Sequence, residues 1–191
     1  MKAIILAAGI ASRLRPLTDT QPKCLLKVGE HSLLERTMNA LINNGIKEFI
    51  IVTGYCQQQI VDFVQAHYPQ QDITFIYNER YASTNNIYSL WLTASQAAKE
   101  EVLLLDSDIL FDPQVVTELL HSEKADTLAV NRHKLGEEEI KVITDPEGRI
   151  MEISKTCSIS QAVGESIGIE KMSAAYTTAL FQELEIMIKQ E

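Results

Sequence analysis

The stretch that decides the fold lies near the N-terminus, where the apolar run Ala3-Ile4-Ile5-Leu6-Ala7-Ala8 leads into Gly9. Such a run is typical of a buried strand that is followed by a turn. The loop beyond it holds one acid, Asp19, and four basic side chains: Arg13, Arg15, Lys23 and Lys27. We expect Gly9 to take a positive φ, which lets backbone N–H groups approach an anion. The stretch therefore predicts a polyphosphate site.

Length and charge limit what the chain can be. Its 191 residues are enough for one domain with its own core. The formal net charge of −9 argues against nucleic acid as a partner, because phosphates would be repelled over most of the surface. The sequence offers no signal peptide, no run of membrane-spanning length and no paired cysteines. We expect a cytoplasmic protein that binds small anions and no membrane; the oligomeric state stays open, with a homo-oligomer among the alternatives.

The first half of the sequence alternates helical and extended patterns. Ser32 and Glu35 have the spacing of a capping box, and Asn44-Gly45 is a typical helix end, so a helix is expected between them. Strands are expected at 49–52 and 73–77, with a second amphipathic helix between them. This βαβαβ order predicts an α/β fold, in which two helix layers cover a doubly wound, mostly parallel sheet. Ligands then bind at the carboxyl ends of the strands.

The second half predicts one more parallel strand and then a small antiparallel excursion. One helix is expected over 85–98, a central strand over 102–105, and a helix that begins at Asp112-Pro113. Four further strands are expected, at 127–130, 140–143, 149–153 and 167–172. A final helix is expected at 173–189.

Two acids follow the expected central strand directly, in the sequence Asp106-Ser107-Asp108. Both carboxylates would emerge at the carboxyl edge of the sheet, where a phosphate ligand is expected. Carboxylate oxygens are the ligands that Mg²⁺ prefers, and a nucleoside triphosphate supplies further oxygens. The plainer alternative is a pair of acids in a solvated turn.

The N-terminal loop has a longer pattern than glycine and basic residues alone. It runs Leu6-Ala7-Ala8-Gly9-Ile10-Ala11-Ser12-Arg13-Leu14-Arg15-Pro16-Leu17-Thr18 and closes with Pro22-Lys23-Cys24-Leu25. This closely resembles the signature of the nucleotidyltransferases that make sugar nucleotides and CDP-alcohols, L-A-A-G-x-G-x-R-x-x-P-L-T followed by P-K-x-L. Ala11 stands where many members carry a second glycine. Alanine keeps the backbone near a phosphate provided that its φ stays negative.

The resemblance implies a fold, a reaction and roles for particular residues. The fold would be Rossmann-like and GT-A-like, with one nucleotidyltransferase domain over residues 1–191. An acceptor phosphate oxygen would attack the α-phosphorus of a nucleotide and release pyrophosphate. Arg13 would hold the β- and γ-phosphates, Lys23 would contact the α-phosphate or the acceptor phosphate, and Asp108 would hold Mg²⁺ with Asp106 orienting it. The nucleotide would lie on Leu6, Ala7, Ala8, Gly9 and Ser107.

The stretch from Tyr81 to Leu90 indicates the subfamily. Four small polar residues at the expected helix start are candidates for reading a base edge: Ser83, Thr84, Asn85 and Asn86. A plain helix N-cap is the alternative. The pattern Asn-Asn-x-Tyr-Ser-Leu resembles the phosphocholine and aminoethylphosphonate cytidylyltransferase branch, so CTP is the favoured nucleotide.

Candidates for the acceptor site come from later in the chain. Lys141, Lys155 and Glu165 occupy positions resembling those where relatives contact the acceptor, although surface charges on a hairpin are equally expected. Tyr88 and Tyr176 are candidates for an aromatic cage around an ammonium group, with Glu165 as its counter-charge. The expected acceptor is an amino-alcohol phosphate or phosphonate, with a sugar 1-phosphate as the alternative.

Two rival functions and one missing feature remain. Asp106-x-Asp108 also fits the metal motif of nucleotide-sugar glycosyltransferases, but these need no basic triphosphate loop. The other rival is a regulatory nucleotide-binding module without catalysis. Relatives carry a second metal-binding aspartate beyond the helix at 173–189, and the sequence given stops at Glu191. Either the family domain is truncated here, or another residue substitutes, or activity is impaired.

Overall fold

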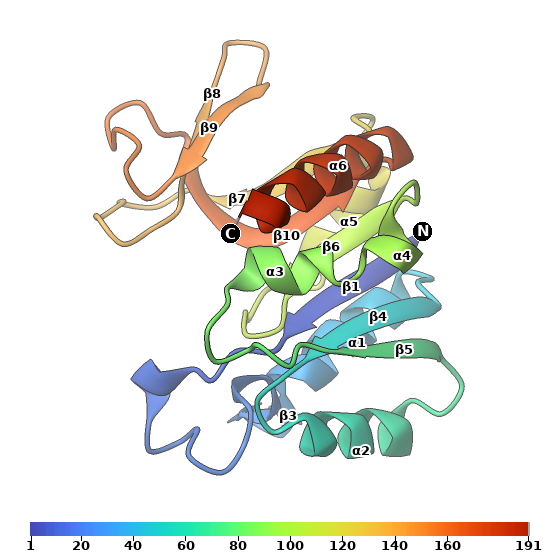
Figure 1. Ribbon diagram of the computed structural model, residues 1–191. Coiled ribbons are helices and arrows are strands. Elements are labelled where there is room, and N and C mark those ends of the chain that lie inside the picture. The colour runs from blue at the N-terminus through green and yellow to red at the C-terminus, as the bar shows by residue number, and fades with distance from the viewer. Residues whose placement is uncertain (191) are drawn as a thin grey trace.

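The computed structural model describes residues 1–190. An eight-stranded sheet has the strand order β5-β4-β1-β6-β10-β8-β9, and β7 pairs with β10 (Figure 1). Its parallel strands are β1 (Lys2–Ala7), β4 (Glu48–Thr53), β5 (Asp72–Tyr77) and β6 (Val102–Asp106). Leu6 of β1 is in register with Val52 of β4 and with Asp106 of β6. The carboxyl ends of these strands therefore meet at one edge of the sheet, as predicted.

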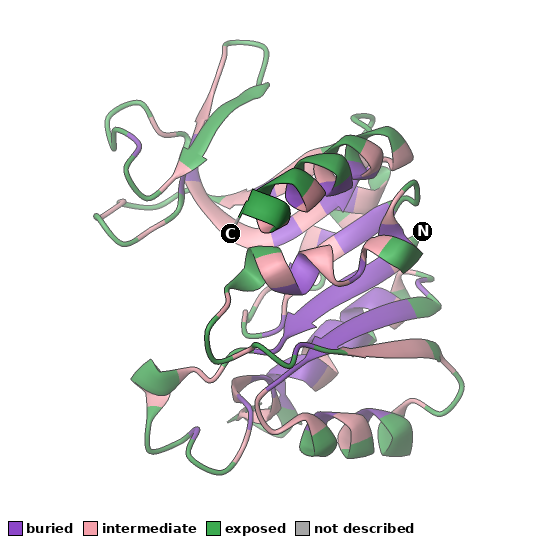
Figure 2. Ribbon diagram, viewed as in Figure 1, coloured by how far each residue is buried: buried purple, intermediate pink, exposed green. Residues whose placement is uncertain are grey.

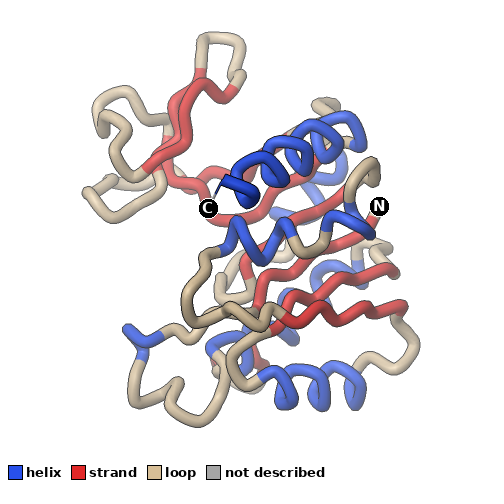
Figure 3. The backbone as a smooth tube through the Cα atoms, in the orientation of Figure 1, coloured by secondary structure: helices blue, strands red, loops and turns tan. Residues whose placement is uncertain are grey.

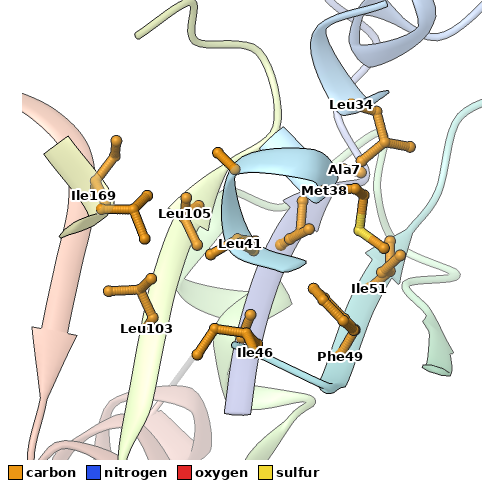
Figure 4. Packing of buried hydrophobic residues seen from close by; sticks show 14 of the residues in the cluster. Ala7, Leu34, Met38, Leu41, Ile46, Phe49, Ile51, Leu103, Leu105 and Ile169 are labelled. Atoms are coloured by element: carbon orange, nitrogen blue, oxygen red, sulfur yellow. The ribbon is translucent and has the colours of Figure 1, made fainter. Parts of the chain in front are cut away.

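Helices cover both faces of the sheet, which confirms the three-layer prediction. One layer consists of α1 (Leu33–Asn43), α2 (Gln57–His67) and α5 (Gln114–His121). The other consists of α3 (Asn86–Trp91), α4 (Ala94–Ala97) and α6 (Ala174–Gln190). Adjacent residues of β1 serve different layers, since Ile5 packs in the first core cluster and Ile4 in the second. Figure 4 shows Leu34, Met38 and Leu41 of α1 packed over the strands in the first cluster.

The antiparallel part of the sheet begins at β10 (Gly164–Met172). It pairs with β6 at Ile169–Met172 and, at its other edge, with β7 (Thr127–Asn131). The hairpin of β8 (Lys141–Thr144) and β9 (Ile150–Ser154) joins only the first residues of β10 and projects from the body of the sheet (Figure 1). β9 is largely exposed, whereas β1, β4 and β6 are buried along most of their length (Figure 2). None of the helices within residues 1–190 is long and apolar enough to cross a membrane.

The single helix expected over 85–98 is wrong, because α3 and α4 are separate helices. The break lies at Thr93, which is fully buried. Its N–H and its hydroxyl both donate to the Leu90 carbonyl, at 2.9 and 2.7 Å, so the chain tightens there instead of continuing the α-helical pattern. A threonine that bonds to its own backbone competes with a regular helix in this way.

The backbone of the loop after β1 differs from the prediction at two positions. Ala11 has a φ of 52° and is left-handed, whereas Gly9 has no positive φ. The left-handed residue of the loop is therefore two positions later than predicted, directly before the 3₁₀ turn η1 (Ser12–Leu14). The Ala11 carbonyl accepts hydrogen bonds from the Leu14 N–H and the Thr18 hydroxyl, both at 3.0 Å, and these fix its conformation.

Side chains from the region of α2 hold the far part of the same loop. The Tyr55 hydroxyl lies 2.9 Å from the Thr18 carbonyl and 2.8 Å from the Asp19 carbonyl, and the Gln59 amide donates to the Thr20 carbonyl at 2.7 Å. The Tyr55 N–H donates to the Ala8 carbonyl at 3.0 Å. The loop then returns through the 3₁₀ turn η2 (Lys23–Leu25) and the short strands β2 (Lys27–Val28) and β3 (His31–Ser32) to α1. The loop is therefore fastened at both ends and in its middle.

The left-handed Ala11 generates a prediction on stability. A left-handed conformation costs an L-residue about 1 to 2 kcal/mol, and glycine is free of that cost. We expect Ala11→Gly to raise the free energy of unfolding by about 0.5 to 1 kcal/mol, measured by urea denaturation. Ala179→Gly in α6 makes the same chemical change in a helix and should lower it by about 1 kcal/mol. Equal destabilisation by both changes would contradict the left-handed assignment.

Candidate active site

The basic loop and the two acids meet at the carboxyl edge of the sheet. Lys23 lies in η2, and its ammonium is 2.6 Å from Oδ2 of Asp108 in the turn after β6. The intervening Ser107 N–H donates to the Leu6 carbonyl at 3.2 Å, which ties this turn to β1. The side chains of Lys23 and Asp108 are 31% and 41% exposed, so a ligand can reach both.

A pocket of about 110 Å³ lies where these segments meet. Most of the residues predicted to bind the nucleotide and metal line it: Leu6, Ala7, Gly9, Lys23, Asn86, Asp106, Ser107 and Asp108. Apart from its two chain neighbours, no residue has an atom within 4 Å of the place where a Cβ on Gly9 would be, so the backbone there faces open space. The loop after β1 and the loop before α3 both lie at this edge (Figure 3). The site is thus assembled from the N-terminal loop, the start of α3 and the end of β6.

Asp106 is the more enclosed of the two acids. Its Oδ1 accepts a hydrogen bond from the Asn86 amide at 2.9 Å. Gly168 of β10 lies beside this carboxylate, since a Cβ added to Gly168 would lie 2.5 Å from Oδ2. Glycine therefore makes room for this carboxylate. Burial, together with the negative charge of Asp108, raises the pKa of Asp106 to about 6, and Lys23 acts in the opposite direction.

The two acids have the chemistry of an open magnesium site. Within residues 1–190, no three side chains among His, Cys, Asp and Glu gather closely enough to enclose a metal ion. Magnesium in nucleotide sites takes one or two carboxylates from the protein and further oxygens from phosphate and water. The carboxyl pair of Asp106 and Asp108 fits this donor set.

Most of the polar residues predicted to read a base make local hydrogen bonds. Asn85 is the N-cap of α3, and its side chain accepts from the N–H groups of Ile87 and Tyr88. The hydroxyls of Ser83 and Thr84 donate to the Arg80 carbonyl, at 3.3 and 2.8 Å. The helix-cap alternative therefore describes Asn85, while Asn86 points to the acid at the end of β6.

Three of the predicted acceptor residues have protein partners outside the pocket at Asp108. Lys141 is buried, and its ammonium donates to the carbonyls of Gly136, Glu137 and Glu139 at 3.1 to 3.2 Å. Lys155 pairs with Glu138 at 3.3 Å, and Glu165 pairs with His133 at 2.9 Å. These ties order the loops beside β8 and β10.

The two tyrosines and Arg13 have different surroundings. The Arg80 guanidinium lies 4.9 Å from the centre of the Tyr88 ring, so a cation already occupies that ring. Tyr176 lines a second pocket, which also contains Asn86 and Asp106. Arg13 is exposed in η1 and has no ion pair with the part of the chain that the structure describes.

Sequence patterns did not reveal Tyr55 and Glu170 as neighbours of the site, and they gave no specific role to Gly168. The Tyr55 hydroxyl holds the loop after β1 by a hydrogen bond to the Thr18 carbonyl. Gly168 leaves space for the side chain of Asp106, and Glu170 lines the second pocket. The last two come from β10, which enters the sheet from the antiparallel side. Only the register of β10 against β6 places them there.

Known proteins share both the sequence and the fold. A model of the family described as nucleotidyl transferase matches residues 2–139. The choline-phosphate cytidylyltransferase of Streptococcus pneumoniae is 39% identical over 107 residues, which cover 56% of this chain and 45% of that protein. The 2-aminoethylphosphonate cytidylyltransferase of Lancefieldella rimae is 30% identical over 112 residues, which cover 59% of this chain and 44% of that protein. Each match thus spans less than half of the relative's own length.

The structural comparison extends over the whole chain. The solved structure of the CTP:phosphocholine cytidylyltransferase from Streptococcus pneumoniae has a TM-score of 0.81 and 27% identity, covering 100% of this chain and 78% of that chain. The resemblance of the N-terminal signature is therefore confirmed by a family model, by relatives of the expected branch and by the fold. This chain belongs to the nucleotidyl transferase family.

Proposed function

We propose that this protein transfers a cytidylyl group from CTP to a small molecule that carries a phosphate or phosphonate, and releases pyrophosphate. The observation that carries the proposal is the 2.6 Å contact between Lys23 of the signature loop and Asp108 after β6. Lys23 would bind phosphate and Asp108 would bind magnesium, and the two lie side by side at the carboxyl edge, where parallel sheets bind their ligands.

The charges of the site suit a nucleotide that arrives with magnesium. Lys23 and Asp108 neutralise each other in this structure. A triphosphate would give Lys23 a new anionic partner and a metal ion would give Asp108 a new cationic one, so neither side chain would be left with an unpaired charge. Bound magnesium would supply charge neutralisation for the triphosphate.

The reaction needs positioning more than covalent chemistry. An acceptor oxygen forms a bond to the α-phosphorus, the bond from that phosphorus to the bridging oxygen of the β-phosphate breaks, and the electron pair leaves with pyrophosphate. Lys23 would stabilise the charge on the reacting phosphates, and the exposed Arg13 would clamp the β- and γ-phosphates with its planar guanidinium. Asp106, held by Asn86, would orient the ligands of Asp108.

The proposed nucleotide and acceptor rest on the named relatives and on the first residue of α3. Both curated relatives described above are cytidylyltransferases, for choline phosphate and for 2-aminoethylphosphonate. Asn86, the first residue of α3, lines the pocket and supports a contact with the nucleotide there.

The test is a matrix of four nucleotides against a panel of acceptors, followed by pyrophosphate release. The panel contains phosphocholine, 2-aminoethylphosphonate, inositol phosphate and glucose 1-phosphate. The expected result is release that depends on magnesium and is fastest with CTP. Binding of CTP without release for any acceptor would favour the regulatory-module alternative.

Lys23→Ala is expected to lower kcat/KM by on the order of a hundredfold, because it removes a charge aimed at the reacting phosphates. Lys47→Ala makes the same change at an exposed position before β4, at the opposite edge of the sheet, and should leave the rate within about twofold. Both variants should keep the wild-type circular dichroism spectrum. A normal rate for Lys23→Ala would remove this residue from the site.

Asp108→Asn is expected to abolish the magnesium-dependent rate, because an amide oxygen is a poor substitute for an anionic ligand. Asp106→Asn should be milder, since an amide oxygen still accepts the hydrogen bond from Asn86. Magnesium titrations of pyrophosphate release measure both effects. Greater sensitivity at Asp106 would reverse the roles assigned to the two acids.

A further inference from the structure

Asn78 directly follows β5 and is almost completely buried, with 1% of its surface exposed. Its N–H donates to the carbonyl of Thr53, the last residue of β4, at 2.8 Å. From there the chain runs along the carboxyl edge of the sheet to α3 (Figure 1). Asn78 is thus the last buried residue before the segment that leads to the site.

The side-chain amide of Asn78 makes three hydrogen bonds. Its Oδ1 accepts from the Arg80 N–H at 2.9 Å, which closes a turn directly after β5. Its Nδ2 donates to the hydroxyls of Thr84 and Ser89, at 3.1 and 3.0 Å. Both N–H donors and the carbonyl oxygen of the amide are therefore used. One buried side chain joins the end of β5, the loop that follows it, and α3.

The segment that Asn78 holds lies mostly at the surface. Residues 79–86 are half-buried or exposed. α3 has six residues, too few for a helix that is stable without tertiary contacts. Its two buried residues are Leu90, which packs in the second core cluster, and Ser89, which bonds to Asn78. The position of α3 relative to β5 therefore depends on the Asn78 amide.

Asn86, the first residue of α3, connects this network to the site. Its amide donates to Oδ1 of Asp106 at 2.9 Å, and Asn86 lines the pocket at Lys23. Asn86 and Ser89 are three positions apart, so they are neighbours on the surface of the helix. A shift of Ser89 would therefore carry Asn86 with it.

We propose that Asn78 is a positioning residue of the nucleotide site, which acts through α3 to hold Asn86 in the pocket. The inference rests on the proposed function, because it takes the nucleotide as the ligand of that pocket. Asn78 is not among the residues that line the pocket, so its effect on the nucleotide passes through Asn86. Lys23 lies in η2 and Asp108 follows β6, so both keep their places without Asn78. Loss of Asn78 should thus weaken nucleotide binding more than it slows the reaction.

The test is a double-mutant cycle of Asn78→Ala and Asn86→Ala, with KM for CTP measured by pyrophosphate release at saturating magnesium and acceptor. We expect each single change to raise KM for CTP about tenfold, and Asn78→Ala to leave kcat within about threefold of the wild type. The double variant should also show a rise of about tenfold and not of about a hundredfold, because Asn78 has no further effect once the Asn86 amide is gone. The dissociation constant of CTP, measured by calorimetry without acceptor, should follow the same pattern.

Asn44→Ala is a matched control for the loss of a bonded amide. The Asn44 Nδ2 donates to the Ala40 carbonyl at 2.8 Å, and its Oδ1 accepts from the Thr117 hydroxyl at 2.8 Å, so this side chain joins α1 to α5. It lies before β4, at the opposite edge of the sheet. We expect Asn44→Ala to lower the thermal unfolding temperature and to leave KM for CTP unchanged.

Ser89→Ala is a milder variant of the same network. It removes one of the three hydrogen bonds of the Asn78 side chain and leaves the other two. We expect it to raise KM for CTP about threefold, and to have no effect when Asn86 is already alanine.

The outcomes distinguish this inference from the proposed function. An unchanged KM in folded Asn78→Ala, a multiplicative rise in the double variant, or an equal rise in Asn44→Ala overturns the positioning role and leaves nucleotidyl transfer standing. If Asn78→Ala fails to fold, Ser89→Ala decides: an unchanged KM, or a rise that persists beside Asn86→Ala, overturns the role. If the wild type binds CTP without releasing pyrophosphate, the proposed reaction is wrong and the dissociation constants alone decide the inference. Absence of CTP binding overturns both.

Discussion

β1 is hydrogen-bonded in parallel to β4 on one side and to β6 on the other, and the site depends on this double pairing. The register that sets Leu6 opposite Asp106 also sets the start of the signature loop beside the two acids. The five apolar residues of β1, Ala3 to Ala7, thus help to bring together Lys23 and Asp108, which lie 85 positions apart in the chain. Without that register the basic loop would have no acids to face.

Local sequence patterns predicted those helices and strands that depend on interactions between residues close together in the chain. The capping box of Ser32 and Glu35 is present in α1 as expected, and the apolar runs form parallel strands. The resemblance of the signature also assigned Lys23 and Asp108 to one site, and the structure brings these two side chains together.

The features that the sequence patterns did not predict depend on contacts that become visible only in the folded structure. The break at Thr93 depends on a buried hydroxyl that finds the Leu90 carbonyl, and helical spacing carries no sign of it. The left-handed residue is Ala11 and not Gly9, because the bonds from Leu14 and Thr18 converge on the Ala11 carbonyl. Lys141 was expected to contact the acceptor or to be a surface charge, yet it is buried and its ammonium donates to three carbonyls of the segment between β7 and β8. Glu170 reaches the second pocket only through the pairing of β10 with β6.

The antiparallel direction of β10 also determines where the chain goes after the site. β10 carries the chain away from the carboxyl edge, and α6 brings it back, so the end of α6 and the N-terminus lie at opposite edges of the sheet (Figure 1). A tag or fusion partner joined before Lys2 would therefore begin on the side remote from the pockets. One joined after Gln190 would begin on their side. For labelling, immobilisation or linkage to another domain, the N-terminus is the attachment point that leaves the approach to Lys23 and Asp108 free.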